Sequence, residues 1–214
     1  MKDLRVEWRN RETLASMCVF GLLVVFLFNF AFETGREETL RMLPGLLWIA
    51  FAFAGILGFN RSFAAERENS CLEGMALAPI DPSAIFVGKM LANLLFLAVA
   101  EVVIVFAASL WYDFSFVPAL GWLALIVFLG TLGYAALGTI FGAVAANTRM
   151  REVMLPILQF PVAFWVLILS IDATSDALRG MGSQANLAGA ARVAGVSTIF
   201  AVVSFLLFEY VLEE

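Results

Sequence analysis

The sequence predicts an all-α polytopic membrane protein with six transmembrane helices. Of its 214 residues, 62% are hydrophobic and 14% are charged, which leaves too little polar surface to cover a soluble domain. A helix that crosses the hydrocarbon layer needs about 20 apolar residues. The chain carries suitable apolar runs at Thr13–Phe32, Met42–Asn60, Met90–Tyr112, Ala119–Ala146, Val153–Ile171 and Val193–Phe208. We therefore expect residues 1–214 to form a single membrane domain.

The positive charges indicate how these helices are oriented. Nine of the 13 Lys and Arg residues lie on the side that holds the N-terminus, and four lie on the other side: Arg36, Arg41, Arg179 and Arg192. Because Lys and Arg collect on the cytoplasmic side of a membrane, both termini are predicted to be cytoplasmic. The net charge of −5 argues against nucleic acid as a partner.

Residues 1–13 precede the first apolar run and have a mixed character. Leu4 and Trp8 share one side of a helix, and Arg5 and Arg9 share another. This pattern predicts a short amphipathic helix that lies at the surface of the membrane lipid. A frayed charged tail is the alternative. After the first span, Glu33–Arg41 is expected to be a short outer loop.

The polar segment between the second and third spans, residues 61–81, is predicted to be a structured cytoplasmic element. From Arg61 to Ala78 the polar and apolar residues alternate at helical period, which indicates an amphipathic helix. Pro79 ends that helix because proline disfavours helical geometry in the residue before it. Asp81 followed by Pro82 is a typical helix start. The third long helix is therefore expected to begin at Pro82.

Two features are expected in the C-terminal half of the chain. Pro156 and Pro161 lie inside the fifth span and should kink it. The connection Asp172–Arg192 is rich in Gly, Ala, Ser and Asn. It could be a solvated loop or a pair of short half-helices that re-enter the membrane, and the composition favours neither.

The residue types argue against catalysis by this chain. There is no histidine, which removes the commonest metal ligand and general base. Gly88-Lys89 is followed by Met90 and lacks the upstream glycine of a phosphate-binding loop. Cys18 and Cys71 lie far apart in the sequence and are expected to stay reduced. We therefore expect no enzymatic activity, no metal site and no cofactor bound directly.

Glu101 is the only charged residue inside a predicted span. A carboxylate at that depth is costly unless it faces protein, pairs with another group or carries a proton. We expect Glu101 to face the interior of the bundle. It could lie on a substrate or coupling path, or it could hold helices together. Trp111, Trp122 and, less clearly, Trp48 fit an outer belt of aromatic residues.

The segment that starts at Glu66 resembles the cytoplasmic coupling region of exporter-type ABC transporter membrane subunits. The matching pieces are Glu66-Arg67-Glu68, Leu72-Glu73, Pro79 and Gly88-Lys89, whereas Ser70 and Cys71 replace a Gly-Thr pair often found there. The resemblance implies an ATPase-coupling interface made by Glu66, Arg67, Glu68, Leu72, Glu73 and Met75. It also implies a periplasmic re-entrant connection at 172–192, with half-helices at Ala173–Leu178 and Ala185–Ala191.

The whole chain resembles the haem exporter protein B (CcmB) family of bacterial cytochrome c maturation. Short motifs occur in the family's order at Asn29–Phe32, Pro44–Trp48, Asn60–Phe63, Gly130–Gly133 and Phe208–Glu214. The resemblance implies a permease subunit of an ABC complex in the bacterial inner (cytoplasmic) membrane. It would couple ATP hydrolysis by another subunit to haem delivery, or to release of a haem-loaded periplasmic chaperone. Haem is then a candidate cargo of the complex.

The resemblance also implies a set of partners. They are a CcmA-like ATPase subunit that binds ATP, a second copy of this chain, a CcmC-like haem-handling membrane protein, a small CcmD-like subunit and a CcmE-like periplasmic haem chaperone. Two alternative functions stay open. The chain could be a structural scaffold whose ATP-driven motion remodels its neighbours and carries nothing across the membrane. It could also be an ABC permease for another amphipathic substrate.

Overall fold

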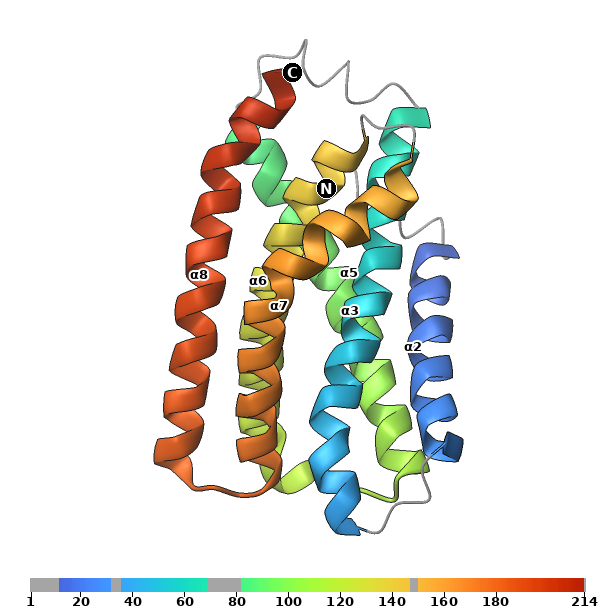
Figure 1. The fold of residues 1–214 in the computed structure, drawn as a ribbon, viewed down its shortest axis with the longest axis vertical. Helices are drawn as coiled ribbons and strands as arrows, with labels where there is room; N and C mark the ends of the chain where they lie inside the picture. Colours follow the sequence, from blue (N-terminus) through green and yellow to red (C-terminus); the bar gives the residue numbers. More distant parts are fainter. Residues whose placement is uncertain (1–11, 32–35, 69–81, 147–149, 214) are drawn as a thin grey trace.

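The computed structural model describes residues 12–31, 36–68, 82–146 and 150–213. These residues form six long helices and one short 3-10 helix, η1 (Figure 1). The elements are α2 (Glu12–Ala31), α3 (Arg36–Glu68), α5 (Pro82–Trp111), η1 (Val117–Ala119), α6 (Leu120–Ala146), α7 (Arg151–Leu178) and α8 (Ser183–Glu213). The described residues contain no strand, which confirms the predicted all-α class.

Consecutive long helices run in opposite directions and form one elongated bundle (Figure 1). All six are long and apolar enough to cross a membrane, which confirms the six predicted spans. The best apolar windows of α3 and α6 are 72% and 67% buried, whereas those of α2 and α8 are 17% and 22% buried. α3 and α6 therefore form the interior, and α2 and α8 flank the bundle on opposite sides (Figure 1).

Helix α3 extends beyond the predicted second span at both ends. It begins at Arg36, so most of the expected outer loop Glu33–Arg41 is helical, and it continues through Arg61 to Glu68. The first part of the 61–81 segment is therefore not a separate helix. The physical reason is that no helix breaker stands between Arg61 and Glu68, and Ala64 and Ala65 favour helix strongly. Residues 69–81 lie outside the described residues, as do residues 1–11 of the expected interfacial helix.

Two of the proline-based predictions are confirmed. α5 begins at Pro82, as the Asp81-Pro82 pair predicts. Pro156 and Pro161 both lie inside α7, and the first half of α7 tilts away from the bundle axis while the second half runs along it (Figure 1). A proline inside a helix removes one backbone hydrogen bond and clashes with the preceding turn, which explains the bend.

The connection predicted at 172–192 is mostly helical, and its re-entry into the membrane stays a prediction. Ala173–Leu178 and Ala185–Ala191 are helical, but they are the end of α7 and the start of α8. Only Arg179–Gly182 separates the two helices, so most of this stretch is helix rather than loop. The Ala-rich sequence lets each helix continue and satisfy its own backbone. The reversal occurs at Gly180 (φ 68°) and Gly182 (φ 84°), where residues with side chains would be strained.

Glycines on α6 allow close contact with three neighbouring helices. A Cβ at Gly138 would collide with the Phe59 ring of α3. Gly130 lies against Trp48 of α3 and Ser170 of α7, and a Cβ at Gly133 would lie 2.5 Å from the Ser197 Oγ of α8. Small residues let helix backbones approach closely in membranes, where lipid tails are as apolar as the core. The core of the bundle is therefore built around the glycine face of α6.

This packing predicts that Gly138→Ala destabilises the protein. The added methyl group overlaps the buried Phe59 ring, and such overpacking typically costs about 1–3 kcal/mol. The Tm of the purified protein in detergent should fall. Gly121→Ala is the matched control, because it lies on the same helix and its Cβ would meet nothing within 4 Å. Equal Tm values for the two variants would contradict this description of the core.

Candidate functional site

The carboxyl group of Glu101 lies in the centre of the bundle. The residue stands on α5 and is 4% exposed. Thr131 of α6 donates a hydrogen bond from its Oγ1 to Glu101 Oε1 at 2.6 Å. The side chain therefore faces protein, as expected from the cost of a carboxylate in contact with lipid. The structure brings it against α6.

A second polar pair lies along the same boundary between α5 and α6. Asn93 Nδ2 donates to Thr139 Oγ1 at 3.1 Å, and Thr139 Oγ1 donates to the Ala135 carbonyl at 2.7 Å. Glu101 follows Asn93 by eight residues, and Thr131 precedes Thr139 by eight. The two pairs thus share one register of an antiparallel contact, about 12 Å apart at 1.5 Å per residue.

We call Asn93, Glu101, Thr131 and Thr139 the α5–α6 polar seam. Lys89 lies one helical turn before Asn93 and is also buried, at 4% exposed. A buried lysine, amide and carboxyl on one helix are unusual in so apolar a chain. The fully buried Leu97 lies between them, one helical turn from Asn93 and one from Glu101. The seam therefore contains two polar levels with an apolar break between them.

A third polar contact joins α3 to α7. Trp48 Nε1 donates to Thr174 Oγ1 at 3.0 Å, and Trp48 is 2% exposed. The predicted place of Trp48 in an outer aromatic belt is therefore wrong, because its indole N–H has a partner inside the protein. Trp111, in contrast, is 40% exposed and contacts the Phe26 ring. Nearby in the interior, Tyr134 of α6 donates its hydroxyl to the Ala52 carbonyl of α3 at 2.7 Å.

Some buried polar groups in the described residues have no hydrogen-bond partner. They belong to Gln159, Ser170, Asn186 and Ser197. All four residues stand on α7 and α8, whereas the buried amide of Asn93 and the carboxyl of Glu101, both on α5, are hydrogen-bonded. These groups of α7 and α8 therefore add no hydrogen bond to the described bundle, and their burial is costly.

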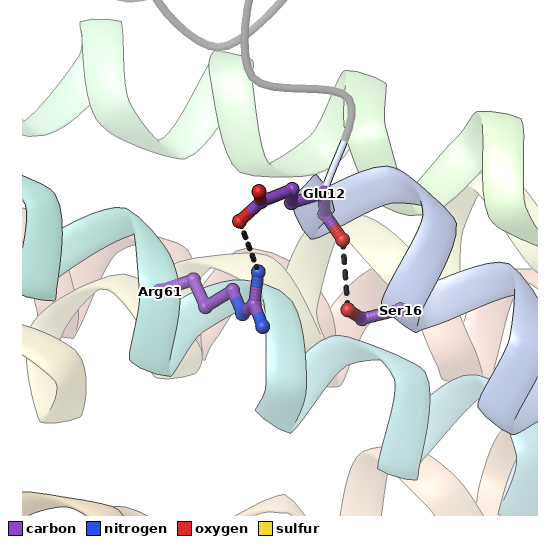
Figure 2. Close-up of polar contacts among 3 residues, drawn as sticks. All are labelled: Glu12, Ser16 and Arg61. Atoms are coloured by element: carbon purple, nitrogen blue, oxygen red, sulfur yellow. Dashed lines mark hydrogen bonds and ion pairs between the residues drawn. The ribbon is translucent and has the colours of Figure 1, made fainter.

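An ion pair joins α2 to α3 at the end where α3 leads into the 61–81 segment. Arg61 Nη1 lies 3.6 Å from Glu12 Oε2, and Ser16 Oγ donates to the Glu12 carbonyl at 2.7 Å (Figure 2). The side chains of Arg61 and Glu12 are 48% and 83% exposed. Exposed pairs stabilise little. The pair nevertheless connects the first turn of α2 to the extension of α3.

The predicted ATPase-coupling residues are only partly placed by the structure. Glu66, Arg67 and Glu68 form the end of α3, and their side chains lie outside the described part of the chain. Leu72, Glu73 and Met75 lie wholly outside the described residues. The coupling interface therefore stays a prediction. Among the described residues, no group of three His, Cys, Asp or Glu could hold a metal ion.

Reasoning from the sequence found Glu101 but missed its partners. Thr131, Thr139 and Asn93 are single polar residues in apolar runs, and their pairing depends on the register between α5 and α6. The signal available in the sequence was the equal spacing of eight residues from Asn93 to Glu101 and from Thr131 to Thr139. Thr174 was missed because it was placed in a connection rather than on the inner face of α7.

The Trp48–Thr174 contact predicts that Thr174→Val destabilises the bundle more than Ser16→Ala does. The first change leaves a buried indole N–H without an acceptor, at a cost of about 1–3 kcal/mol. The second removes only an exposed bond within one helix. Thermal unfolding of both variants in the same detergent provides the measurement. A Tm loss for Thr174→Val no larger than that for Ser16→Ala would show that the contact contributes nothing.

Comparison with known proteins places the chain in a family. A family profile described as "CcmB protein" matches residues 1–207, from the start of the chain into α8. "Heme exporter protein B" of Pseudomonas aeruginosa is 28% identical over 188 residues, which cover 87% of this chain and 83% of that protein. The protein of the same name from Rhodobacter capsulatus is 29% identical over 189 residues, with 87% and 85% covered. Since the profile runs through all six long helices, the chain belongs to the CcmB protein family.

Proposed function

We propose that this chain is the membrane-spanning permease subunit of an ABC complex that serves cytochrome c biogenesis. The observation that carries the proposal is the family match over residues 1–207, together with relatives named "Heme exporter protein B" that align over most of their length. The six-helix bundle supports it, because all six long helices of the described residues, from α2 to α8, are long and apolar enough to cross a membrane. Haem is the proposed cargo of the complex.

The energy for this function would come from ATP hydrolysed by a separate, CcmA-like subunit. The proposed contact is the 61–81 segment, through Glu66, Arg67, Glu68, Leu72, Glu73 and Met75. The shape of α3 supports this role, since the helix is continuous from Arg36 to Glu68 and packs against α2, α5, α6 and α7. A force applied at the Glu68 end of α3 would therefore act on four other helices.

The proposed assembly contains further subunits. A second copy of this chain, a CcmC-like haem-handling membrane protein and a small CcmD-like subunit would lie beside it in the membrane. A CcmE-like chaperone would accept or release haem on the periplasmic side. Coupling of ATP hydrolysis to haem delivery, or to release of the loaded chaperone, is the proposed reaction of the whole complex.

A scaffold that moves but carries nothing is the second candidate function. One observation favours it: the polar seam between α5 and α6 is broken by the fully buried Leu97, and the larger fully buried side chains of the described core are mostly aromatic or aliphatic. This single chain therefore has no continuous polar route along that seam. Transport would then require a path between this chain and another subunit.

We also propose that the protein lies in the bacterial inner membrane with both termini in the cytoplasm. Six spans place the two termini on one side, together with the 61–81 segment, and this is the side with the larger number of Lys and Arg residues. The turn Arg179–Gly182 then faces the periplasm.

Charge reversal tests the coupling interface. Glu66→Lys combined with Glu73→Lys should abolish co-purification of the ATPase subunit and cytochrome c maturation. Breaking charge pairs at an interface costs roughly 2–5 kcal/mol, which is at least about a thirtyfold loss of affinity. Glu37→Lys combined with Glu38→Lys is the matched control at the opposite end of α3. Normal ATPase binding by the Glu66/Glu73 variant would refute the proposed interface.

Cysteine labelling tests the orientation. In a background with Cys18 and Cys71 replaced by Ala, Met181→Cys should react with a membrane-impermeant maleimide in intact cells whose outer membrane is permeable to it. Met181 is 59% exposed in the turn between α7 and α8. Ala173→Cys, at a fully buried position of α7, should stay unlabelled. Labelling of Met181→Cys only after the inner membrane is opened would reverse the proposed orientation.

A further inference from the structure

Glu101 combines deep burial with the absence of a counter-charge in the described residues. Its hydrogen-bond partner there is the neutral hydroxyl of Thr131, at 2.6 Å. The ion pair that the described part of the chain contains, between Glu12 and Arg61, lies far away at the end of the bundle. An ionised carboxylate in hydrocarbon is costly unless it is paired. The surroundings of Glu101 therefore suit a carboxyl group that carries a proton.

In the described residues, no charged side chain of the helices around Glu101 forms an ion pair with its carboxyl group. α5 packs against α2, α3, α6 and α8. Within the described residues, α2 and α6 each carry one titratable side chain inside the span, Cys18 and Tyr134, and both are uncharged in their ordinary state. Arg192 of α8 lies inside its span, but it is exposed and its Nε donates to the Ala188 carbonyl of the same helix at 3.4 Å. The other charged residues of α2, α3 and α8 stand nearer the helix ends, and the Tyr134 hydroxyl already donates to a carbonyl of α3.

We propose that Glu101 is a reversible proton-binding site, reached along the α5–α6 polar seam from the end of the bundle where α5 begins. Buried Lys89 of α5 stands just before the seam, and the seam then provides the Asn93–Thr139 pair and the Glu101–Thr131 pair. These levels are about 6 and 12 Å apart along the helix. The ligand of the site is a proton, exchanged between the carboxyl group and water that enters the seam.

Leu97 controls entry to this site. Leu97 lies between the two polar pairs and is fully buried. Its side chain lies beside Gly55 of α3, where an added Cβ would be 3.4 Å from Leu97 Cδ2. Water reaches the carboxyl group only when this side chain moves or the seam widens. When the proton leaves, the remaining carboxylate keeps a single described donor, Thr131, so the ionised form favours an opened seam. Proton binding at Glu101 therefore favours the closed arrangement of α5 and α6.

Infrared difference spectroscopy of the whole protein in lipid bilayers tests the proton site directly. A neutral carboxyl group has a C=O stretching band above the amide bands, and the wild-type spectrum at neutral pH should contain one that is lost in Glu101→Gln. Thr131→Val should shift this band to higher frequency, because it removes the hydrogen bond to Oε1. If Glu101→Gln instead removes carboxylate bands, Glu101 is ionised and the proposal fails.

Transfer of the sample from H₂O to D₂O tests the route. Deuteration lowers the frequency of the Glu101 band, and the time course of that shift measures access to water. Leu97→Ala should speed the shift because it removes the apolar break, and Asn93→Leu should slow it. Ser197→Ala, a buried change on α8, is the control and should leave the rate unchanged. Equal rates in wild type, Leu97→Ala and Asn93→Leu would overturn the proposed route along the seam.

Discussion

The close approach of α6 to its neighbours is the constraint on which the rest of the bundle depends. Hydrocarbon offers no hydrophobic drive between helices, so association rests on packing and on hydrogen bonds between helices. α6 achieves the first with glycine: Gly138 admits the Phe59 ring, and Gly130 and Gly133 admit Ser170 and Ser197. It achieves the second with Thr131 and Thr139, which bind α5. One helix therefore organises both sides of the bundle.

The two sides of α6 differ in how they are held. Towards α5 and α3 the contacts include directional bonds from Thr131, Thr139 and Tyr134. Towards α7 and α8 the described contacts are close packing, and the polar groups that lie there include several without partners. Trp48–Thr174 is the side-chain hydrogen bond described between α7 and the rest of the bundle. Directional bonds fix one register on the first side, and the close fit of small residues fixes it on the second.

The success of the sequence-based predictions depended on whether the signal was local. The six spans were predictable because an apolar run of sufficient length is a property of the chain itself. The helix ends were not, since the charged residues of 36–41 and 61–68 are compatible with helix once it leaves the hydrocarbon. The re-entrant connection was inferred from resemblance, and the Ala-rich ends of α7 and α8 simply continue as helix. Burial of Glu101 followed from the cost of its charge, but its pairing with Thr131 required the register between two helices.

The continuity of α3 connects these observations to function. A separate helix attached by a loop would transmit motion poorly, whereas α3 is continuous from Arg36 to Glu68, inside the 61–81 segment. The Glu12–Arg61 pair stands at the point where α3 leaves the bundle and ties it to α2 (Figure 2). Because that pair is exposed, it stabilises the contact between α2 and α3 only weakly. A displacement of α3 would act through Trp48 on α7 and through Phe59 on α6. Movement at the Glu68 end of α3 would thus reach α7 and α6 through two buried aromatic side chains of one continuous helix.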